Sequence, residues 1–366
     1  MILRFTKTIH SEYRTIFTHS GVMLVMIFAP LIYAVLYSSA YAKQVATEVP
    51  IAVIDHSNTH SSRALASTLN ASPYIDITHK ATDMPAAQRL LFDENIYGVI
   101  YIPQDYEDCD LQGHQRTISL YLDASYFLIY RQVLEGVAGA ISSIKEAQPK
   151  ISLRSHTLYN PALGYGTFIM PAVLLVILQQ TALMGIGIVG ALRRKRVASS
   201  LLSRIFVYVT IYAPLCAYIF AIHYRVFGYP ENGGLIGIIA VIASYMIAVI
   251  SLALALSTLF RRVETPLILI IWTSIPVLLI SGASLPVESF PHWMHTLGLL
   301  LPSSSAVPAF IRVQSMGATV GEVIPEIVHL WVLIILYCVI YKQSIRAKLL
   351  GYPMPQRDIH TTIINL

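Results

Sequence analysis

The stretch SHTLYNPALGYGTFIMPAVLLVILQQTALMGIGIVGAL, Ser155 to Leu192, contains no Asp, Glu, Lys or Arg. A helix that crosses about 30 Å of hydrocarbon needs roughly 20 mostly apolar residues. The stretch exceeds that length and therefore predicts a transmembrane helix. The whole chain has the same character, because only 12% of its residues are charged, against about 25% in a soluble domain.

Further charge-free runs place the remaining spans. Four of them are long enough to cross a membrane: residues 15–42, 205–224, 232–260 and 265–287. A shorter run at 327–341 reaches spanning length only if the helix begins near Val320. Together with 155–192 these runs predict an α-helical polytopic membrane protein with six transmembrane helices, five of them within residues 155–366.

Residues 289–311 are also uncharged, but three prolines interrupt them. Proline inside a helix removes a backbone hydrogen bond and clashes with the preceding turn. We therefore expect a broken outer segment over 286–312, made of short helices, rather than a single straight span.

The Lys and Arg residues set the orientation of the spans. With the N-terminus inside, the inner segments hold 14 of the 25 basic residues but only three of the 20 acidic residues. This asymmetry accounts for the net charge of +5 without a nucleic-acid partner. Both ends of the chain, including the C-terminal tail, are expected to be cytoplasmic.

Residues 1–19 are predicted to form an amphipathic helix on the inner membrane surface. Apolar residues recur there at steps of three and four among basic ones, as in Ile9, Tyr13 and Ile16. A solvated extension is the alternative. Residues 20–42 follow as the first span, which we interpret as an uncleaved signal-anchor because its apolar run is too long for a secretory signal.

Residues 43–154, between the first and second spans, predict a small α/β domain outside the cytoplasm. Its strand patterns lie at 49–54, 74–78, 97–102 and 116–122, and its helical patterns at 61–69, 84–94 and 127–147. Asp83 is the expected N-cap of the second helix. Alternating strands and helices are typical of α/β folds. Cys109 is the domain's one cysteine, so it cannot form an intrachain disulfide there.

Motifs for catalysis and cofactors are missing. The chain has no phosphate-binding G-x-x-x-x-G-K-[ST] sequence, no H-E-x-x-H and no G-x-S-x-G. His292 with His295, and His56 with His60, are spaced so that either pair could hold a metal, but neither has a third ligand nearby. Asp55 is a candidate catalytic carboxylate, although a polar turn is the favoured interpretation. We expect no cofactor, no metal and no enzymatic activity.

Gln179, Gln180 and Thr181 are the polar groups deepest in a predicted span. Hydrogen bonding between helices is the favoured interpretation, over contact with a transported molecule. Ion-coupled transporters often carry an ionised residue in mid-membrane, and these spans carry almost none. If the protein moves a solute, the energy must therefore come from another protein, such as an ATPase on the cytoplasmic face.

Several short stretches, taken in order, resemble the membrane permease subunits of ABC type-2 exporters, in the subgroup with a large extracytoplasmic domain between spans one and two. The matching stretches are Pro50–Asp55 with Ser61–Leu65, Tyr97–Tyr106, Tyr159–Pro161, Leu285–Pro286, Phe290–Trp293 and Leu301–Ser304. Each stretch is short, but their order and spacing extend over most of the chain.

The resemblance implies a complex in the bacterial inner membrane. Two permease chains, identical or paralogous, would form the translocation path, and two cytoplasmic ATP-binding-cassette ATPases would drive export. A periplasmic adaptor is a further partner that the resemblance allows. The residues expected to couple to the ATPases are Glu12, Arg14, Arg193, Arg194, Lys195, Arg196, Ser199 and Ser200. The path would include Gln179, Gln180 and Thr181, and the outer gate Pro286, Pro291, Trp293 and Pro302.

One loop departs from the family's pattern. Many members carry acidic residues and a Gly-Thr pair after span two, whereas this chain has Arg193-Arg-Lys-Arg196. An ordinary positive-inside anchor explains these arginines equally well. Two other functions stay open: a membrane-anchored sensor or assembly protein whose α/β domain binds a ligand or partner, and an ATP-independent channel or carrier.

Overall fold

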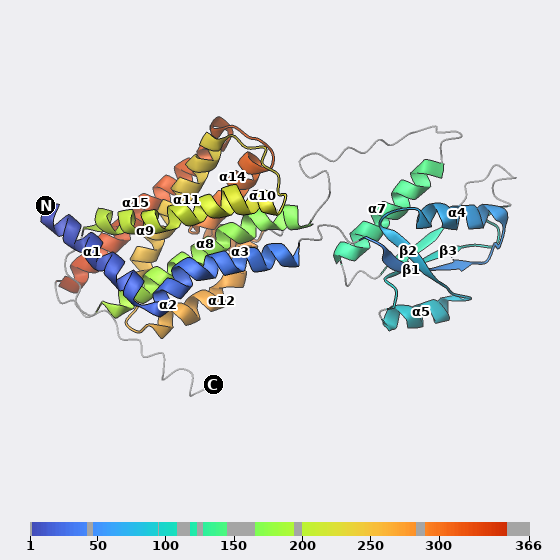
Figure 1. Ribbon diagram of the computed structural model, residues 1–366, viewed down its shortest axis with the longest axis horizontal. Helices are drawn as coiled ribbons and strands as arrows, with labels where there is room; N and C mark the ends of the chain where they lie inside the picture. Colours follow the sequence, from blue (N-terminus) through green and yellow to red (C-terminus); the bar gives the residue numbers. More distant parts are fainter. Residues whose placement is uncertain are drawn as a thin grey trace. The chain divides into compact units, whose positions relative to one another are not determined.

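The computed structural model describes residues 2–41, 47–93, 95–107, 118–122, 127–144, 165–193, 200–282 and 290–349. The chain divides into two compact units (Figure 1). A helical unit comprises Met1–Ala42 and Gly166–Leu366, and a second unit comprises Lys43–Tyr165. Each unit is described below by itself.

The helical unit begins with α1 (Ile2–Thr18), and the first span follows it. This span consists of α2 (Ser20–Met23), a π-helical turn η1 (Leu24–Phe28) and α3 (Ala29–Ala40). Pro30 stands in the first turn of α3. Because proline has no N–H to give to the preceding turn, the regular α-helical bonding changes at this point.

Long apolar helices make up the rest of the helical unit. They are α8 (Tyr165–Leu192), α9 (Leu201–Ala217) continued by η3 (Tyr218–His223) and α10 (Tyr224–Val226), α11 (Leu235–Ser257), α12 (Glu264–Ile280), and η5 (Val320–Val323) continued by α15 (Ile324–Leu349). Five described helices are long and apolar enough to cross a membrane, which shows a polytopic helical membrane protein. The fifth predicted span corresponds to α12, whose 17 residues are shorter than the other spans.

The proline-containing segment that was expected to be broken does form two separate helices. Helix α13 (His292–Gly298) and helix α14 (Pro302–Gln314) meet at 83°. Pro302 occupies the first turn of α14, where a missing N–H costs nothing. One straight span across this segment is therefore excluded.

Helix α8 lies at the centre of the helical unit. In its most apolar window 89% of the residues are buried by the chain itself, against 22% in the first span. Glycines on α8 permit close packing: a Cβ added at Gly190 would lie 2.6 Å from Ser257 Cβ. Helix α11 can therefore approach the α8 backbone at this point.

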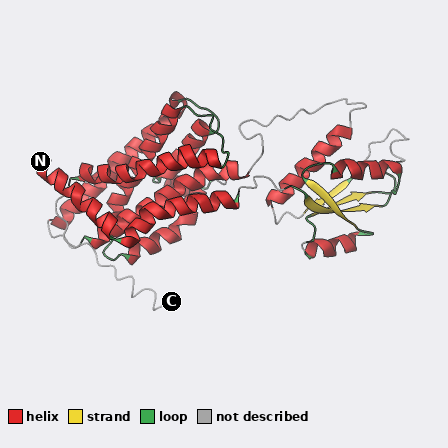
Figure 2. Ribbon diagram, viewed as in Figure 1, coloured by secondary structure: helices red, strands yellow, loops and turns green. Residues whose placement is uncertain are grey.

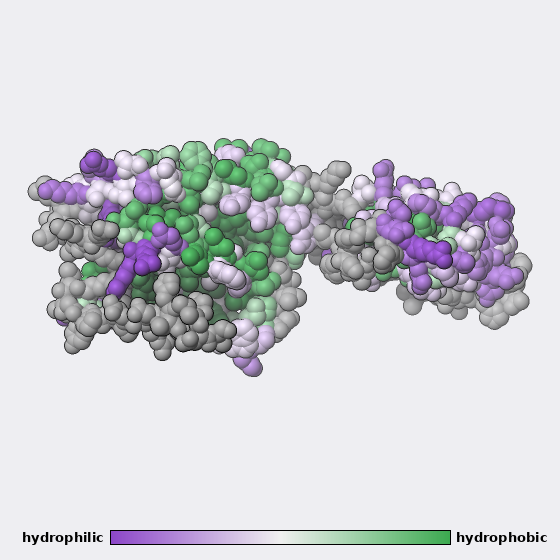
Figure 3. Space-filling model, turned by 90° about the horizontal axis from the view of Figure 1, so that it is seen from below, coloured by the Kyte–Doolittle hydropathy of each residue, from purple (hydrophilic) through white to green (hydrophobic). Residues whose placement is uncertain are grey.

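The surface of the helical unit exposes many large apolar side chains. Ile236 and Trp272 expose 80% and 79% of their area, and apolar residues gather over the helical unit in Figure 3. The second unit is mostly hydrophilic on the same face. The exposed apolar side chains of the helical unit are thus of the kind that contacts lipid.

The second unit is an α/β fold around a four-stranded sheet of order β2-β1-β3-β4 (Figure 2). The strands are β1 (Val49–Asp55), β2 (Ile75–Lys80), β3 (Gly98–Ile102) and β4 (Ser119–Leu122). Strands β1, β2 and β3 are parallel and β4 is antiparallel to β3, with Val49 opposite Ile75 and Gly98 opposite Leu122. These strands confirm the four strand patterns seen in the sequence, with shifted ends.

Among the described residues, three helices cover the sheet: α4 (His60–Asn70), α5 (Met84–Phe92) and α7 (Phe127–Ile144). Side chains alternate between faces along a strand, so Ile51 of β1 packs with α4 and α7 while Ala52 packs with α5. The predicted N-cap is confirmed, because Asp83 Oδ1 accepts a hydrogen bond from the N–H of Ala86 at 2.8 Å.

Candidate functional site

The side chain of Glu12, in α1, is fully buried against two arginines. Glu12 Oε1 lies 2.8 Å from Arg193 Nη1 and 2.9 Å from Arg204 Nε. These contacts are ion pairs by distance, without a directed hydrogen bond to Oε1. Tyr208 donates a hydrogen bond to Glu12 Oε2 at 3.0 Å. A carboxylate away from water needs such partners, since an unpaired buried charge is strongly destabilising.

Further hydrogen bonds extend this group to other helices. Arg204 Nη1 donates to the hydroxyl of Tyr341 in α15 at 2.9 Å. Arg193, which directly follows α8, donates from Nη2 to Ser11 Oγ at 3.2 Å. We call Glu12, Arg193, Arg204, Tyr208 and Tyr341 the Glu12 cluster. It joins four elements that are far apart in sequence: α1, the end of α8, α9 and α15.

The local fold explains why Glu12 is buried. Thr8, Glu12 and Ile16 are all buried and recur every four residues, so they form one face of α1. Phe5 and Phe17 are exposed instead. The pattern of apolar and basic residues that predicted this helix did not indicate that its acidic residue would be buried. Helix α1 uses its acidic residue to pack against α9.

The remaining residues expected to couple to an ATPase are scattered or undescribed. Arg14 is exposed on α1, and Ser200 precedes α9 without a side-chain cap bond. Arg194, Lys195, Arg196 and Ser199 lie outside the described residues. Sequence reasoning missed Tyr208 and Tyr341 as members of the cluster. The available signal was the scarcity of inner acidic residues, since Glu12 is one of three against 14 basic residues.

The polar residues in the middle of α8 face the interior of the unit. Gln179 Nε2 donates to Ser303 Oγ at 3.4 Å, and Gln179 Oε1 accepts from Tyr245 at 3.4 Å. Thr181 donates to the carbonyl of Ile177 at 2.8 Å. The amide of Gln180 is buried without a hydrogen-bond partner among the described residues. Gln179 thus takes part in hydrogen bonds between α8, α11 and α14.

The expected gate residues fall on the broken segment. Pro291 directly precedes α13, Trp293 is largely exposed on α13, and Pro302 is buried at the start of α14. Pro286 lies outside the described residues. The structure therefore places three of the four around the 83° bend.

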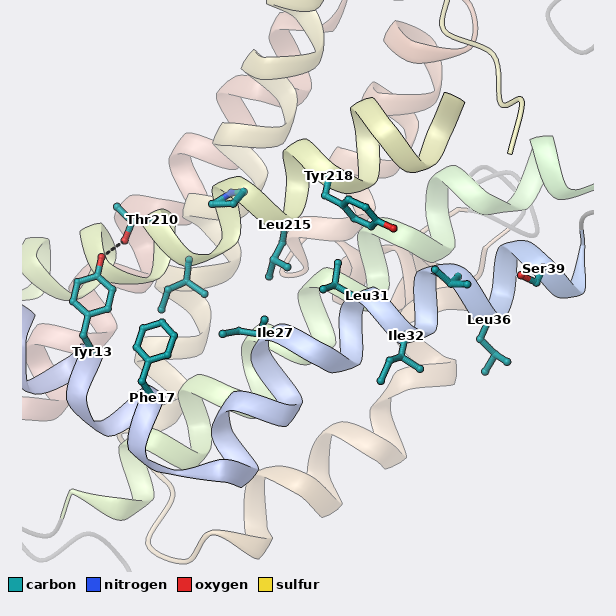
Figure 4. A pocket seen from close by; sticks show the side chains of 13 residues that line it. Tyr13, Phe17, Ile27, Leu31, Ile32, Leu36, Ser39, Thr210, Leu215 and Tyr218 are labelled. Carbon is teal, nitrogen blue, oxygen red and sulfur yellow. Dashed lines mark hydrogen bonds between the residues drawn. The ribbon is translucent and has the colours of Figure 1, made fainter. Parts of the chain in front are cut away.

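An apolar groove of about 1060 Å³ runs between the first span and α9 (Figure 4). Leu31 and Leu36 line it from the first span, and Leu215 lines it from α9. At one end the hydroxyls of Tyr13 and Thr210 share a hydrogen bond. Tyr13 neighbours Glu12 in α1, so this groove begins beside the Glu12 cluster.

Asp55, the candidate catalytic carboxylate, has structural partners. Asp55 Oδ1 accepts from the N–H of Asn58 at 2.9 Å, and Asp55 Oδ2 accepts from Ser62 Oγ at 2.7 Å. The carboxylate thus stabilises the turn between β1 and α4. Over the described ranges, no group of three or more His, Cys, Asp and Glu residues could hold a metal ion.

Several apolar helices packed around α8, with a buried charge cluster at one end, define the class of the protein as a multi-pass helical membrane protein. Comparison with protein families matches residues 21–341 to the family described as ABC-2 family transporter protein. The chain belongs to this family, as a permease subunit of an ABC transporter that works with ATP-binding-cassette subunits. Such permeases are generally non-catalytic. No curated protein matches the chain.

Proposed function

We propose that the chain is the permease of an exporter in which two permease chains form the path and two separate cytoplasmic ATPases supply the energy. The Glu12 cluster is the observation that carries this proposal. It connects α1 with α8, α9 and α15 through buried charges. A force applied to α1 would therefore reach three spans at once.

The proposed topology has six crossings with both termini in the cytoplasm of a bacterial cell. The concentration of Lys and Arg on the inner segments supports this orientation. It leaves the α/β unit, Lys43–Tyr165, outside the cytoplasm, as in the exporter subgroup that the sequence resembles. In that position the unit would contact an adaptor or shape the exit.

The proposed mechanism begins at the cytoplasmic face. Closure of the ATPases around ATP displaces α1 and the connection between α8 and α9. Because Glu12 holds Arg193 and Arg204 at ion-pair distance, the ends of both helices move with α1. Arg204 passes the movement to Tyr341 in α15. The outward path then opens on the side of the α13–α14 bend.

The family match favours this function over a membrane-anchored sensor and over an ion-driven carrier. Chain and ATPase can be co-purified and reconstituted in liposomes, where ATP hydrolysis with and without the permease is compared. We expect the permease to stimulate hydrolysis. A permease that purifies without any ATPase and leaves hydrolysis unchanged would contradict the proposal.

The Glu12 cluster gives a sharper version of this experiment. Glu12→Gln removes the charge but keeps the size, whereas Glu264→Gln changes an exposed carboxylate at the start of α12. We expect Glu12→Gln to retain ATPase binding and to lose stimulation, and Glu264→Gln to behave as the unchanged chain. Equal stimulation by both variants would remove the cluster from the coupling mechanism.

A further inference from the structure

A second cavity, of about 650 Å³, lies between α9–η3 and α11. Its body is apolar. Ala213, Ala217 and Ala221 recur every four residues along α9–η3, and Ile239 and Ala243 line the cavity from α11. The small side chains along α9–η3 leave space between the two helices. The volume is within the range of about 300–1,000 Å³ that holds small molecules in proteins.

One end of this cavity is polar. Arg225 follows η3, Glu231 lies in the connection to α11, and Gln314 ends α14; all three line the cavity. Arg225 Nε donates to Glu231 Oε2 at 3.1 Å. The lining thus combines one cation, one anion and one uncharged amide. Their charges sum to zero, and so they favour a neutral or zwitterionic group over one with net charge.

The Gln314 side chain has an unmet hydrogen bond. Only 1% of Gln314 is exposed. Its Nε2 donates to the carbonyl of Pro230 at 3.4 Å, but its Oε1 is buried without a partner among the described residues. Buried polar atoms are nearly always hydrogen-bonded. Within the described part of the chain, Gln314 Oε1 therefore lacks the donor that a buried acceptor requires, and its residue lines the polar end of the cavity.

The backbone around Gln314 is fixed. The N–H of Asn232 donates to the Gln314 carbonyl at 3.0 Å, and Asn232 Nδ2 donates to the carbonyl of Ser315 at 2.8 Å. A Cβ at Gly233 would lie 2.6 Å from the carbonyl oxygen of Val313, so glycine lets the two segments approach. The polar end is thus held in place before any ligand arrives.

We propose that this cavity binds an amphipathic molecule drawn from the bilayer. Its apolar chain lies between α9–η3 and α11. Its head group is neutral or zwitterionic and donates a hydrogen bond to Gln314 Oε1, beside the Arg225–Glu231 pair. Binding requires neither an ATPase nor a second permease chain. The site can therefore exist even if the proposed exporter function fails, and the reverse is also true.

The test uses the full-length chain in nanodiscs and a lysophosphatidylethanolamine with a diazirine in its chain, a zwitterionic probe whose ammonium group donates hydrogen bonds. Light attaches the probe to nearby side chains, and mass spectrometry locates the adducts. We expect adducts on the cavity-lining parts of α9–η3 and α11. Unlabelled zwitterionic lysophospholipid should compete for them about tenfold better than an anionic one, the effect of one polar interaction.

Two variants separate the cavity from the general lipid surface. Ala217→Trp fills the cavity and should abolish the adducts, whereas Ile222→Trp, an exposed residue outside the lining, should keep them. Gln314→Met keeps the length but removes the acceptor, and should abolish the preference between head groups. Gel filtration verifies that each variant is folded. If Ala217→Trp misfolds, the head-group preference of Gln314→Met tests the proposal instead.

Three results would overturn the proposal. Uniform adducts over all lipid-facing helices, without competition, would show bulk lipid only. Adducts that Ala217→Trp leaves unchanged would place the probe elsewhere. Cross-links from the cavity to a second copy of the chain would show that a helix fills it instead.

Discussion

The Glu12 carboxylate in α1 and the Arg204 guanidinium in α9 form a buried ion pair, with Oε1 and Nε 2.9 Å apart. Glu12 has no exposed side-chain area, and Arg204 very little. Such a pair holds two helices together only while both charges are present. Loss of one partner leaves the other charged and away from water.

Arg204→Leu should therefore be among the most harmful single changes in the helical unit. Removing one member of a buried pair costs at most about 3–5 kcal/mol of the free energy of unfolding, and Arg193, which stays 2.8 Å from Glu12 Oε1, offsets part of this cost. Thermal unfolding in detergent measures the effect. Arg14→Gln, on the exposed side of α1, serves as the control and should change little. Equal shifts for the two variants would contradict the importance of the pair.

Tyr208→Phe should destabilise the chain more than Tyr13→Phe. The Tyr208 hydroxyl donates to a charged carboxylate, a bond worth about 1.5–3 kcal/mol. Tyr13 bonds to the neutral hydroxyl of Thr210, which is worth about 0.5–1.5 kcal/mol. Both changes remove one oxygen from a tyrosine, so the same unfolding assay compares them directly. The reverse order would show that Oε2 of Glu12 finds another donor.

Gly190→Ala should separate α8 from α11. The new methyl group would meet both the side chain and the backbone carbonyl of Ser257, and overpacking typically costs about 1–3 kcal/mol. A methyl group at Gly234, in the same unit, meets nothing within 4 Å. Gly234→Ala should consequently leave the unfolding temperature nearly unchanged. A tolerated Gly190→Ala would mean that the helices separate at little cost.

Cysteine labelling in intact cells tests the proposed orientation. In a Cys109→Ser background, Ser67→Cys in α4 should react with a membrane-impermeant maleimide from outside. Gln343→Cys in α15 should react only after the cells are permeabilised. Both positions are exposed on their own units. Labelling of Gln343→Cys in intact cells would reverse the topology.

The sequence predicted which segments form helices and strands, but it did not predict how deeply each of them is buried by the rest of the chain. Hydropathy identified α8 as a span, and compact apolar runs rich in β-branched residues identified β1 and β3. Hydropathy could not show that α8 is enclosed while the first span is not, since both windows have a mean hydropathy of 2.1. The difference arises from packing between distant residues, for which a local pattern carries no signal.

The candidate site was only partly visible in the sequence. Glu12 and Arg193 were both assigned to coupling, yet nothing in their spacing indicated that they touch. Tyr208 and Tyr341 resemble many other tyrosines in apolar spans, and their roles depend on the position of α1. Long-range ion pairs are set by tertiary structure, so the cluster needed the fold before it could be recognised.

The enclosure of α8 also determines how the protein tolerates change. A membrane helix with one buried face accepts apolar replacements of different size on its lipid-facing side, so that tolerance rises and falls about every 3.6 residues. The first span is largely exposed and should show this periodic tolerance. A scan of all single substitutions, scored by the amount of protein expressed in the membrane, measures it. Helix α8 has 89% of its most apolar window buried and should show none. Its sequence should be restricted on every side, and inherited variation should collect in the outer helices.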